Sequence, residues 1–162
     1  MEIRIAVAKI DRSGVGNSGD TVETIERPNG GLSVVLADGQ NRGENQKAIS
    51  TMVSHRVIDN IIDGVRDGAA IRATSSSIFA EYQGAIQANL NVISADLQTN
   101  TILVSRNNPV PVFLINDELV DCLASDSEPI GGRGDIIPTI VELPIQPGMA
   151  VIVFSDGVYR AG

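Results

Sequence analysis

The chain has few of the residues that mark several common classes of protein. Its one cysteine, Cys122, excludes a disulfide framework within the chain. Its one histidine, His55, has only Cys122 to join it, so a zinc site built from histidine and cysteine is not expected. The 12 basic residues are outnumbered by 20 acidic ones, and the net charge of −8 argues against nucleic acid or an anionic membrane as the main partner. No apolar run approaches the roughly 20 residues that span a bilayer.

What the chain does contain is typical of one globular domain. Its 162 residues are 43% hydrophobic and 20% charged, enough to bury a sizeable core. The N-terminal residues 1–5 alternate and carry charge, unlike a signal peptide, so we expect a cytoplasmic protein. Neither a repeat nor a linker interrupts the sequence, which predicts a single domain over residues 1–162.

Strand patterns occupy both ends of the chain. Ile3, Ile5 and Val7 alternate with small or charged residues, which predicts a first strand. A glycine-rich turn over residues 13–20 follows. Further strands are expected at 21–27, 32–37, 89–97, 101–106, 110–115, 119–123, 139–143 and 150–154, with a hairpin turn at 28–31.

The middle of the chain has helical periodicity. Apolar residues recur every three or four positions from about Asn45, predicting an amphipathic helix that closes near Gly68. A second helix is expected over residues 69–82, ending at Gly84. Strands, two adjacent helices and then strands indicate an α+β domain with largely antiparallel sheets.

Three aspartates stand in similar settings. Asp38 and Asp156 each precede a glycine and directly follow a predicted apolar strand, and Asp20 follows Gly19. A carboxylate at a strand end faces an open edge, where a hydrated Mg²⁺ or Mn²⁺ can approach, and the carbonyl of a following glycine is an unobstructed further ligand. Asp-Gly pairs are also common in turns, so the spacing by itself leaves both a metal site and simple turns open.

These motifs resemble a known family. Ser18-Gly-Asp20, then Ala37-Asp38-Gly39, then Ser155-Asp156-Gly157 follow the order seen in the metal-dependent PPM (type 2C) serine/threonine phosphatases. The chain is most similar to the short bacterial branch typified by the sporulation stage II protein E phosphatase domain and the stressosome phosphatase. The segments 108–113 and 128–132 add to the likeness, which covers nearly the whole chain. The resemblance implies an antiparallel β-sandwich flanked by paired helices.

The resemblance also implies the site. Asp38 would bridge two Mn²⁺ or Mg²⁺ ions, the carbonyl of Gly39 would bind one of them, and Asp156 would bind the other. Asp20 would lie close to the ions, through coordinated water. A metal-bridging hydroxide would then attack the phosphorus of phosphoserine or phosphothreonine without a phosphoenzyme intermediate. The substrate implied is a phosphorylated bacterial regulator with a STAS domain, in a stress or sporulation sigma-factor pathway.

The sequence departs from the family pattern in two places. Gly19 occupies the position of a glutamate in the larger enzymes, and Arg12 or Arg42 would have to replace their phosphate-binding arginine. The family's Asp-Asp-x-Thr strand is not found after Asp156, so we expect the domain as given to lack the family's final helix and strand: either the sequence is a fragment, or its second metal site is incomplete. The alternative hypothesis is therefore a catalytically weak binding module of the same fold for the same kind of partner.

Three other features have simpler interpretations. Residues 14–19 spell the dinucleotide-binding pattern, but that function requires a helix directly afterwards, and the residues that follow have no helical period. His55 is expected at or near the surface of the first helix. Cys122 is expected to pack in a β segment.

Overall fold

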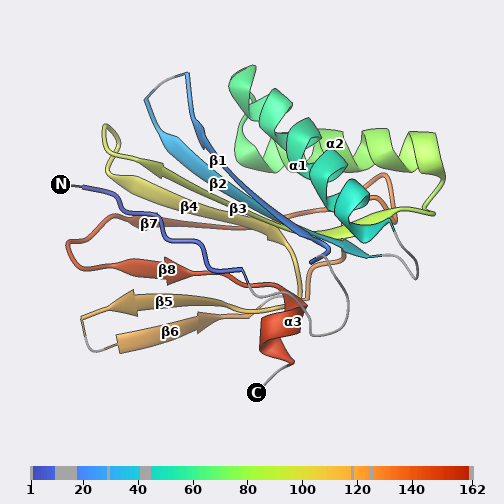
Figure 1. Cartoon of the computed structure of the whole chain (residues 1–162). Helices are drawn as coiled ribbons and strands as arrows, with labels where there is room; N and C mark the ends of the chain where they lie inside the picture. The colour runs from blue at the N-terminus through green and yellow to red at the C-terminus, as the bar shows by residue number, and fades with distance from the viewer. Residues whose placement is uncertain are drawn as a thin grey trace.

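The computed structural model describes residues 2–9, 18–28, 30–40, 45–117, 119–124 and 126–160. In these residues a pair of helices covers one face of a five-stranded sheet, and a three-stranded sheet lies on the other side (Figure 1). All neighbouring strands within each sheet are antiparallel. The predicted α+β sandwich of antiparallel sheets flanked by paired helices is confirmed.

The two sheets are formed from segments that alternate along the chain. The large sheet has the order β1-β2-β3-β4-β7, and the small sheet has the order β6-β5-β8. The strands of the large sheet are β1 (Asp20–Glu26), β2 (Leu32–Gln40), β3 (Gln87–Asp96), β4 (Thr101–Asn107) and β7 (Thr139–Pro144). Those of the small sheet are β5 (Val112–Asn116), β6 (Leu119–Leu123) and β8 (Ala150–Ile152).

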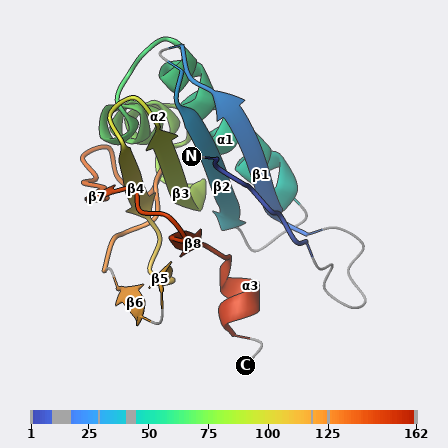
Figure 2. The ribbon, with the colours of Figure 1, turned by 90° about the vertical axis from the view of Figure 1, so that its left-hand side faces the viewer.

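The helices are α1 (Gln46–Ile62), α2 (Asp67–Tyr82) and the short α3 (Asp156–Tyr159). Figure 2 shows α1 and α2 on one side of the large sheet and the small sheet with α3 on the other. Within the described residues, none of the helices is long and apolar enough to cross a bilayer.

The first helix ends earlier than predicted. We expected it to close near Gly68, but it ends at Ile62, and Gly68 lies in the first turn of α2. Gly64 has a φ of 84°, in the left-handed region, and its N–H donates to the carbonyl of Ile61 at 3.0 Å. A glycine in this conformation commonly ends a helix. The prediction extended the helix too far because Val65, which lies after Gly64, still packs against the core and so continues the apolar pattern in the sequence.

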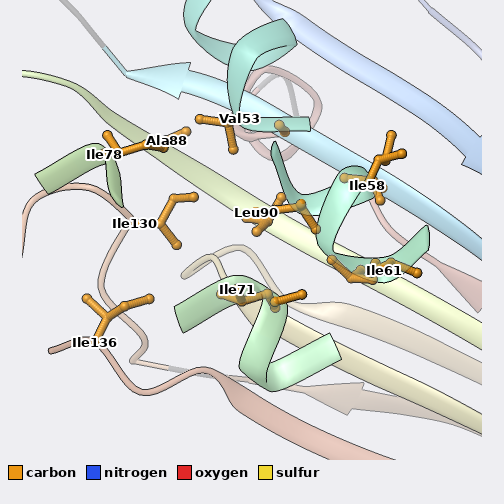
Figure 3. Close-up of a cluster of buried hydrophobic side chains, with 14 of the residues drawn as sticks. Val53, Ile58, Ile61, Ile71, Ile78, Ala88, Leu90, Ile130 and Ile136 are labelled. Carbon is orange, nitrogen blue, oxygen red and sulfur yellow. The ribbon is translucent and has the colours of Figure 1, made fainter. Parts of the chain in front are cut away.

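The main core lies between the helices and the large sheet (Figure 3). Apolar residues of α1 that recur every four positions form one stripe on the helix. This stripe contacts the apolar side chains of α2, β2 and β3 and of the loop after β6. Each fully buried valine, leucine or isoleucine of this core stabilises the fold by about 1.5–3 kcal/mol. The members include Val35, Ala37, Ile49, Val53, Val57, Ile61, Ile71, Ile78, Ala88, Leu90, Val92, Ile130 and Ile136.

A buried ion pair fixes the start of α2 to the sheet. The Arg27 guanidinium donates to Asp67 Oδ1 at 2.5 Å, and the Ser94 hydroxyl donates to Asp67 Oδ2 at 2.5 Å. Ser33 completes the cluster, since its hydroxyl lies 2.7 Å from that of Ser94. The Asp67 side chain is 0% exposed, but both of its oxygens have hydrogen-bond donors, so its charge is compensated where it is buried.

The first predicted strand is wrong. Residues 2–9 have no regular secondary structure, and Ile5 and Val7 are 40% and 57% exposed. Alternation describes which side chains can share a face, but a strand forms only when a neighbouring strand supplies hydrogen bonds, and no described strand pairs with this segment.

Candidate metal centre

Asp38 lies inside β2, not after it as the sequence predicted. The strand continues to Gln40 because it is paired on both sides at this point: Asp38 is opposite Asp20 of β1 and Asn89 of β3. Directly paired residues share one face of a sheet, so these three side chains form a row across three strands. Val35 and Ala37 face the helices, and side chains alternate along a strand, so the row faces the side of the small sheet.

Asp156 reaches the same region from the other end of the chain. It does not occupy a turn after a strand, since β8 ends at Ile152, short of the predicted 150–154, and Asp156 begins α3. The start of β1, the end of β2 and α3 lie at one end of the molecule (Figure 1). Asp156 is close enough to Asp38 for its charge to act on the Asp38 carboxyl. The fold therefore brings together all three aspartates that the sequence singled out.

The surroundings of Asp38 make its negative charge unfavourable. Burial, followed by the charges of Asp20 and Asp156, raises the pKa of Asp38 from 3.8 to about 7. A hydrogen bond between the Asp20 and Asp38 side chains acts in the same direction, and one from Asn89 acts against it. Asp38 is 9% exposed, whereas the Asp156 side chain is 35% exposed. The cluster thus has a buried centre and an accessible side.

The chemistry of this cluster fits a divalent cation. Asp38 Oδ2 is buried and has no hydrogen-bond partner in the described part of the chain, although a buried carboxylate oxygen normally has one. A cation would satisfy that oxygen and remove the repulsion among three carboxylates, and oxygen ligands suit Mg²⁺ or Mn²⁺. As the described side chains stand, no three histidine, cysteine, aspartate or glutamate residues converge tightly enough to enclose an ion. A bound ion would have to draw the carboxylates together.

The packing of α1 against β2 explains why residue 39 is a glycine. A Cβ at this position would lie 2.2 Å from the carbonyl oxygen of Gln46, so any side chain would collide with the first turn of α1. Only glycine lets the helix approach β2 this closely. Its predicted role as a carbonyl ligand is compatible with this position and stays a prediction.

The backbone of Asp20 is held by α1. The Lys47 ammonium donates to the carbonyl oxygen of Asp20 and to the Thr21 hydroxyl, both at 2.7 Å. Loss of hydration, with a smaller effect from the charge of Lys9, lowers the pKa of Lys47. The N–H of Asp20 donates to the Ser18 hydroxyl at 3.2 Å. The first turn of α1 therefore fixes the start of β1 at the aspartate row.

Two residues of this region were missed by the sequence analysis. Asn89 lies at one end of the row and is 2% exposed, and Lys47 fixes the other end. An amide at the start of the predicted strand 89–97 was the available signal for Asn89, but Asn91 carries the same signal in the same strand. Its place opposite Asp38 depends on the strand register, which the sequence does not give.

The remaining predicted candidates lie elsewhere. Arg12, Arg42 and the glycines at 14 and 16 fall outside the described residues. Gly19 is followed by strand β1, not by a helix, which contradicts a dinucleotide site. His55 is exposed on α1, as predicted. Cys122 is exposed on the edge strand β6, so the predicted packing role is wrong; an edge strand of a small sheet leaves its side chains uncovered.

The fold is that of the type 2C phosphatase domains in several solved structures. The phosphatase domain of SpoIIE from Bacillus subtilis with a fragment of its regulatory domain superposes with a TM-score of 0.78 at 21% identity, covering 91% of this chain and 44% of that one. The serine/threonine phosphatase of S. agalactiae has a TM-score of 0.74 at 15% identity, covering 93% and 77%. The RsbU and RsbW domains of a Mycobacterium tuberculosis protein give 0.71 at 17% identity, covering 86% and 40%.

The sequence identifies the family within this class. The model of the Stage II sporulation protein E (SpoIIE) family matches residues 28–162, so the chain belongs to that family, and the predicted resemblance is confirmed. A search of curated proteins gave no match. The chain spans less than half of the SpoIIE structure to which it is similar, 44% of its length.

Proposed function

We propose that this protein is a Mn²⁺- or Mg²⁺-dependent phosphatase that hydrolyses phosphoserine or phosphothreonine on a bacterial regulatory protein. One observation carries the proposal: a SpoIIE-family fold brings Asp20, Asp38 and Asp156 to one place, and the buried Asp38 Oδ2 has no hydrogen-bond partner among the described residues. The small sheet is built from β5, β6 and β8, and β7 of the large sheet lies between β6 and β8 along the chain, which supports a single phosphatase domain over residues 1–162.

The residues have distinct proposed roles. Asp38 would bridge two ions from the buried centre of the cluster, with the Gly39 carbonyl on one ion and Asp156 on the other. Asp20 would act through water, held in place by its backbone contact with Lys47. When bound, the ions would supply a nucleophilic hydroxide near neutral pH and neutralise charge on the phosphoryl oxygens.

The reaction is a simple hydrolysis. The oxygen of water forms a bond to phosphorus, the bond from phosphorus to the serine or threonine oxygen breaks, and that oxygen takes up a proton. The products are inorganic phosphate and the unmodified side chain. The protein's part is to hold the carboxylates together at an edge that is open to solvent on the side of Asp156, where a phosphorylated side chain can enter.

We further propose a STAS-domain regulator of a stress or sporulation sigma-factor pathway as the substrate. Support comes from the family and from two similar folds, the SpoIIE phosphatase, which is described as a cell fate determinant, and an RsbU domain. The net charge of −8 gives no long-range attraction to a phosphorylated protein, so recognition would depend on the ions and on surface shape.

The direct test is release of phosphate from a phosphoserine peptide with Mn²⁺ or with EDTA. We expect Mn²⁺-dependent turnover, and a loss of at least about 100-fold in Asp38→Asn, because this carboxylate is the centre of the cluster. Asp121→Asn is the matched control, since it removes one exposed acidic charge from β6 and should leave turnover unchanged. Turnover that persists in EDTA or in Asp38→Asn would contradict the proposal. Binding of a phosphorylated partner without turnover would favour the alternative, a catalytically weak binding module.

A further inference from the structure

Strand β3 carries two buried asparagines on the face that looks toward the small sheet. Asn89 and Asn91 are 2% and 1% exposed, and they are two positions apart along the strand, so they share a face. Asn89 is opposite Asp38, whereas Asn91 is opposite Leu36 on one side and Arg106 on the other. In the following row the pair is Val34 with Ile93, which is fully apolar. In these rows of β2 and β3, the polar groups on this face are thus concentrated toward the aspartate row.

Asn89 makes a contact that Asn91 does not. Its side chain lies directly opposite Asp38 in the β2-β3 register and favours the charged form of the Asp38 carboxyl, lowering its pKa. Its Oδ1 is buried and has no hydrogen-bond partner among the described residues, a state that it shares with Asn91 Oδ1, so the place opposite Asp38 is what distinguishes Asn89. A buried polar atom in that state costs about 1–3 kcal/mol, so an apolar side chain would serve the fold better at this position.

We propose that Asn89 is a positioning residue for the metal centre: its side chain orients the Asp38 carboxylate for metal binding, and its unpartnered Oδ1 is available to water bound at the site. The inference rests on the proposed function, because it gives Asn89 a role only if Asp38 holds a metal ion. A hydrogen bond to a ligating carboxylate fixes the orientation of that ligand before the ion arrives. Asn89 is well suited to this task because β3 is hydrogen-bonded to β2 along the whole length of β2.

The strand supplies its own control. Asn89→Leu and Asn91→Leu make the same chemical change, on the same face of the same strand, at positions of nearly equal burial. They differ in two respects: Asn89 lies opposite Asp38 of β2, whereas Asn91 lies opposite Arg106 of β4. Both variants remove a buried amide, so general effects on packing and folding should be similar, and a specific effect on the metal centre should appear in one alone.

The experiment is calorimetric titration of Mn²⁺ into the wild-type protein and both variants, with thermal unfolding in EDTA measured alongside. We expect Asn89→Leu to weaken Mn²⁺ binding about 10–100-fold, as loss of a residue that orients a ligand typically does, and Asn91→Leu to leave it within about twofold. Asn89→Ala, a smaller change, serves as a second variant if the leucine substitution fails to fold, and the same weakening is expected because alanine has no polar group to offer Asp38.

The following outcomes would overturn the inference. Equal Mn²⁺ affinity in the wild type and Asn89→Leu, or equal weakening in both leucine variants, would show that Asn89 does not position Asp38, while Mn²⁺ binding by the wild type would leave the proposed function intact. If the wild type itself binds no Mn²⁺ and releases no phosphate, the proposed function fails and this inference fails with it.

Discussion

Asp38 and Asp67 are both buried aspartates followed by a glycine, yet their surroundings are opposite. The Asp67 side chain is 0% exposed and has the Arg27 guanidinium on one oxygen and the Ser94 hydroxyl on the other. Asp38 is 9% exposed, faces the charges of Asp20 and Asp156, and leaves Oδ2 without a partner in the described part of the protein. Burial alone therefore does not indicate function. A buried charge that the protein compensates is structural, whereas one that it leaves uncompensated is where a ligand with opposite charge is expected.

The largest expected effect is on stability, at the compensated site. Asp67→Asn removes the partner of Arg27, whose side chain is 15% exposed and cannot fully regain water. We expect a loss of about 3–5 kcal/mol in the free energy of unfolding, measured by urea denaturation in EDTA. Mn²⁺ affinity per folded molecule should be unchanged. A loss below about 1 kcal/mol would show that the ion pair does not hold α2 to the sheet.

The glycines that follow the two aspartates sharpen the contrast. In Gly39→Ala the new Cβ would meet the backbone carbonyl of Gln46 at 2.2 Å, and α1 would have to move; we expect a loss of about 1–3 kcal/mol. In Gly68→Ala the Cβ would meet Ile140 Cδ1 at 2.5 Å, but that side chain is 46% exposed and can turn away. Because alanine also favours the helix, we expect Gly68→Ala to change stability by less than about 1 kcal/mol. Urea denaturation of the two variants measures the difference, and equal losses would contradict the close approach of α1 at Gly39.

The smallest effect is a gain in stability at the uncompensated site. In metal-free protein the pKa of Asp38 is raised from 3.8 to about 7, so folding favours its protonated form. This contribution is fully present below about pH 4 and is lost as the pH rises to 7 and above. In EDTA at pH 8, Asp38→Asn should therefore be more stable than the wild type by about 1–2 kcal/mol, and the difference should shrink as the pH falls toward 4.

Urea denaturation in EDTA across this pH range checks the prediction, with Asp67→Asn as the comparison. That variant should be less stable than the wild type at pH 8. If Asp38→Asn were also destabilised at pH 8, the Asp38 carboxylate would be compensated in a way that the structure does not show, and the contrast between the two aspartates would fail.

Local patterns in the sequence predicted most of this fold. The β1-β2 pair, the helices α1 and α2, and the β3-β4 and β5-β6 pairs are formed by residues whose partners lie nearby along the chain. The predictions that failed depended on distant partners. Ile3, Ile5 and Val7 have a strand pattern without a paired strand, and the apolar period of α1 continued past the glycine that ends the helix.

The residues of the site also divide into those that a local motif predicts and those whose role depends on distant partners. Asp20, Asp38 and Asp156 were predicted because each stands beside a glycine in a motif that can be read along the chain. Asn89 was missed because its importance comes only from the β2-β3 register, and Asp67, an Asp-Gly pair of the same kind, is structural because Arg27 reaches it from 40 residues away. The motif predicts a candidate, and the partners in the fold decide its role.

The most direct test of the central claim is anomalous diffraction from a crystal of the protein equilibrated with Mn²⁺. We predict an ion within about 2–2.5 Å of an Asp38 carboxylate oxygen, with Asp156 or the Gly39 carbonyl in the same coordination shell. Ordered Mn²⁺ found only elsewhere on this acidic protein, with Asp38 Oδ2 still unpartnered, would contradict the account.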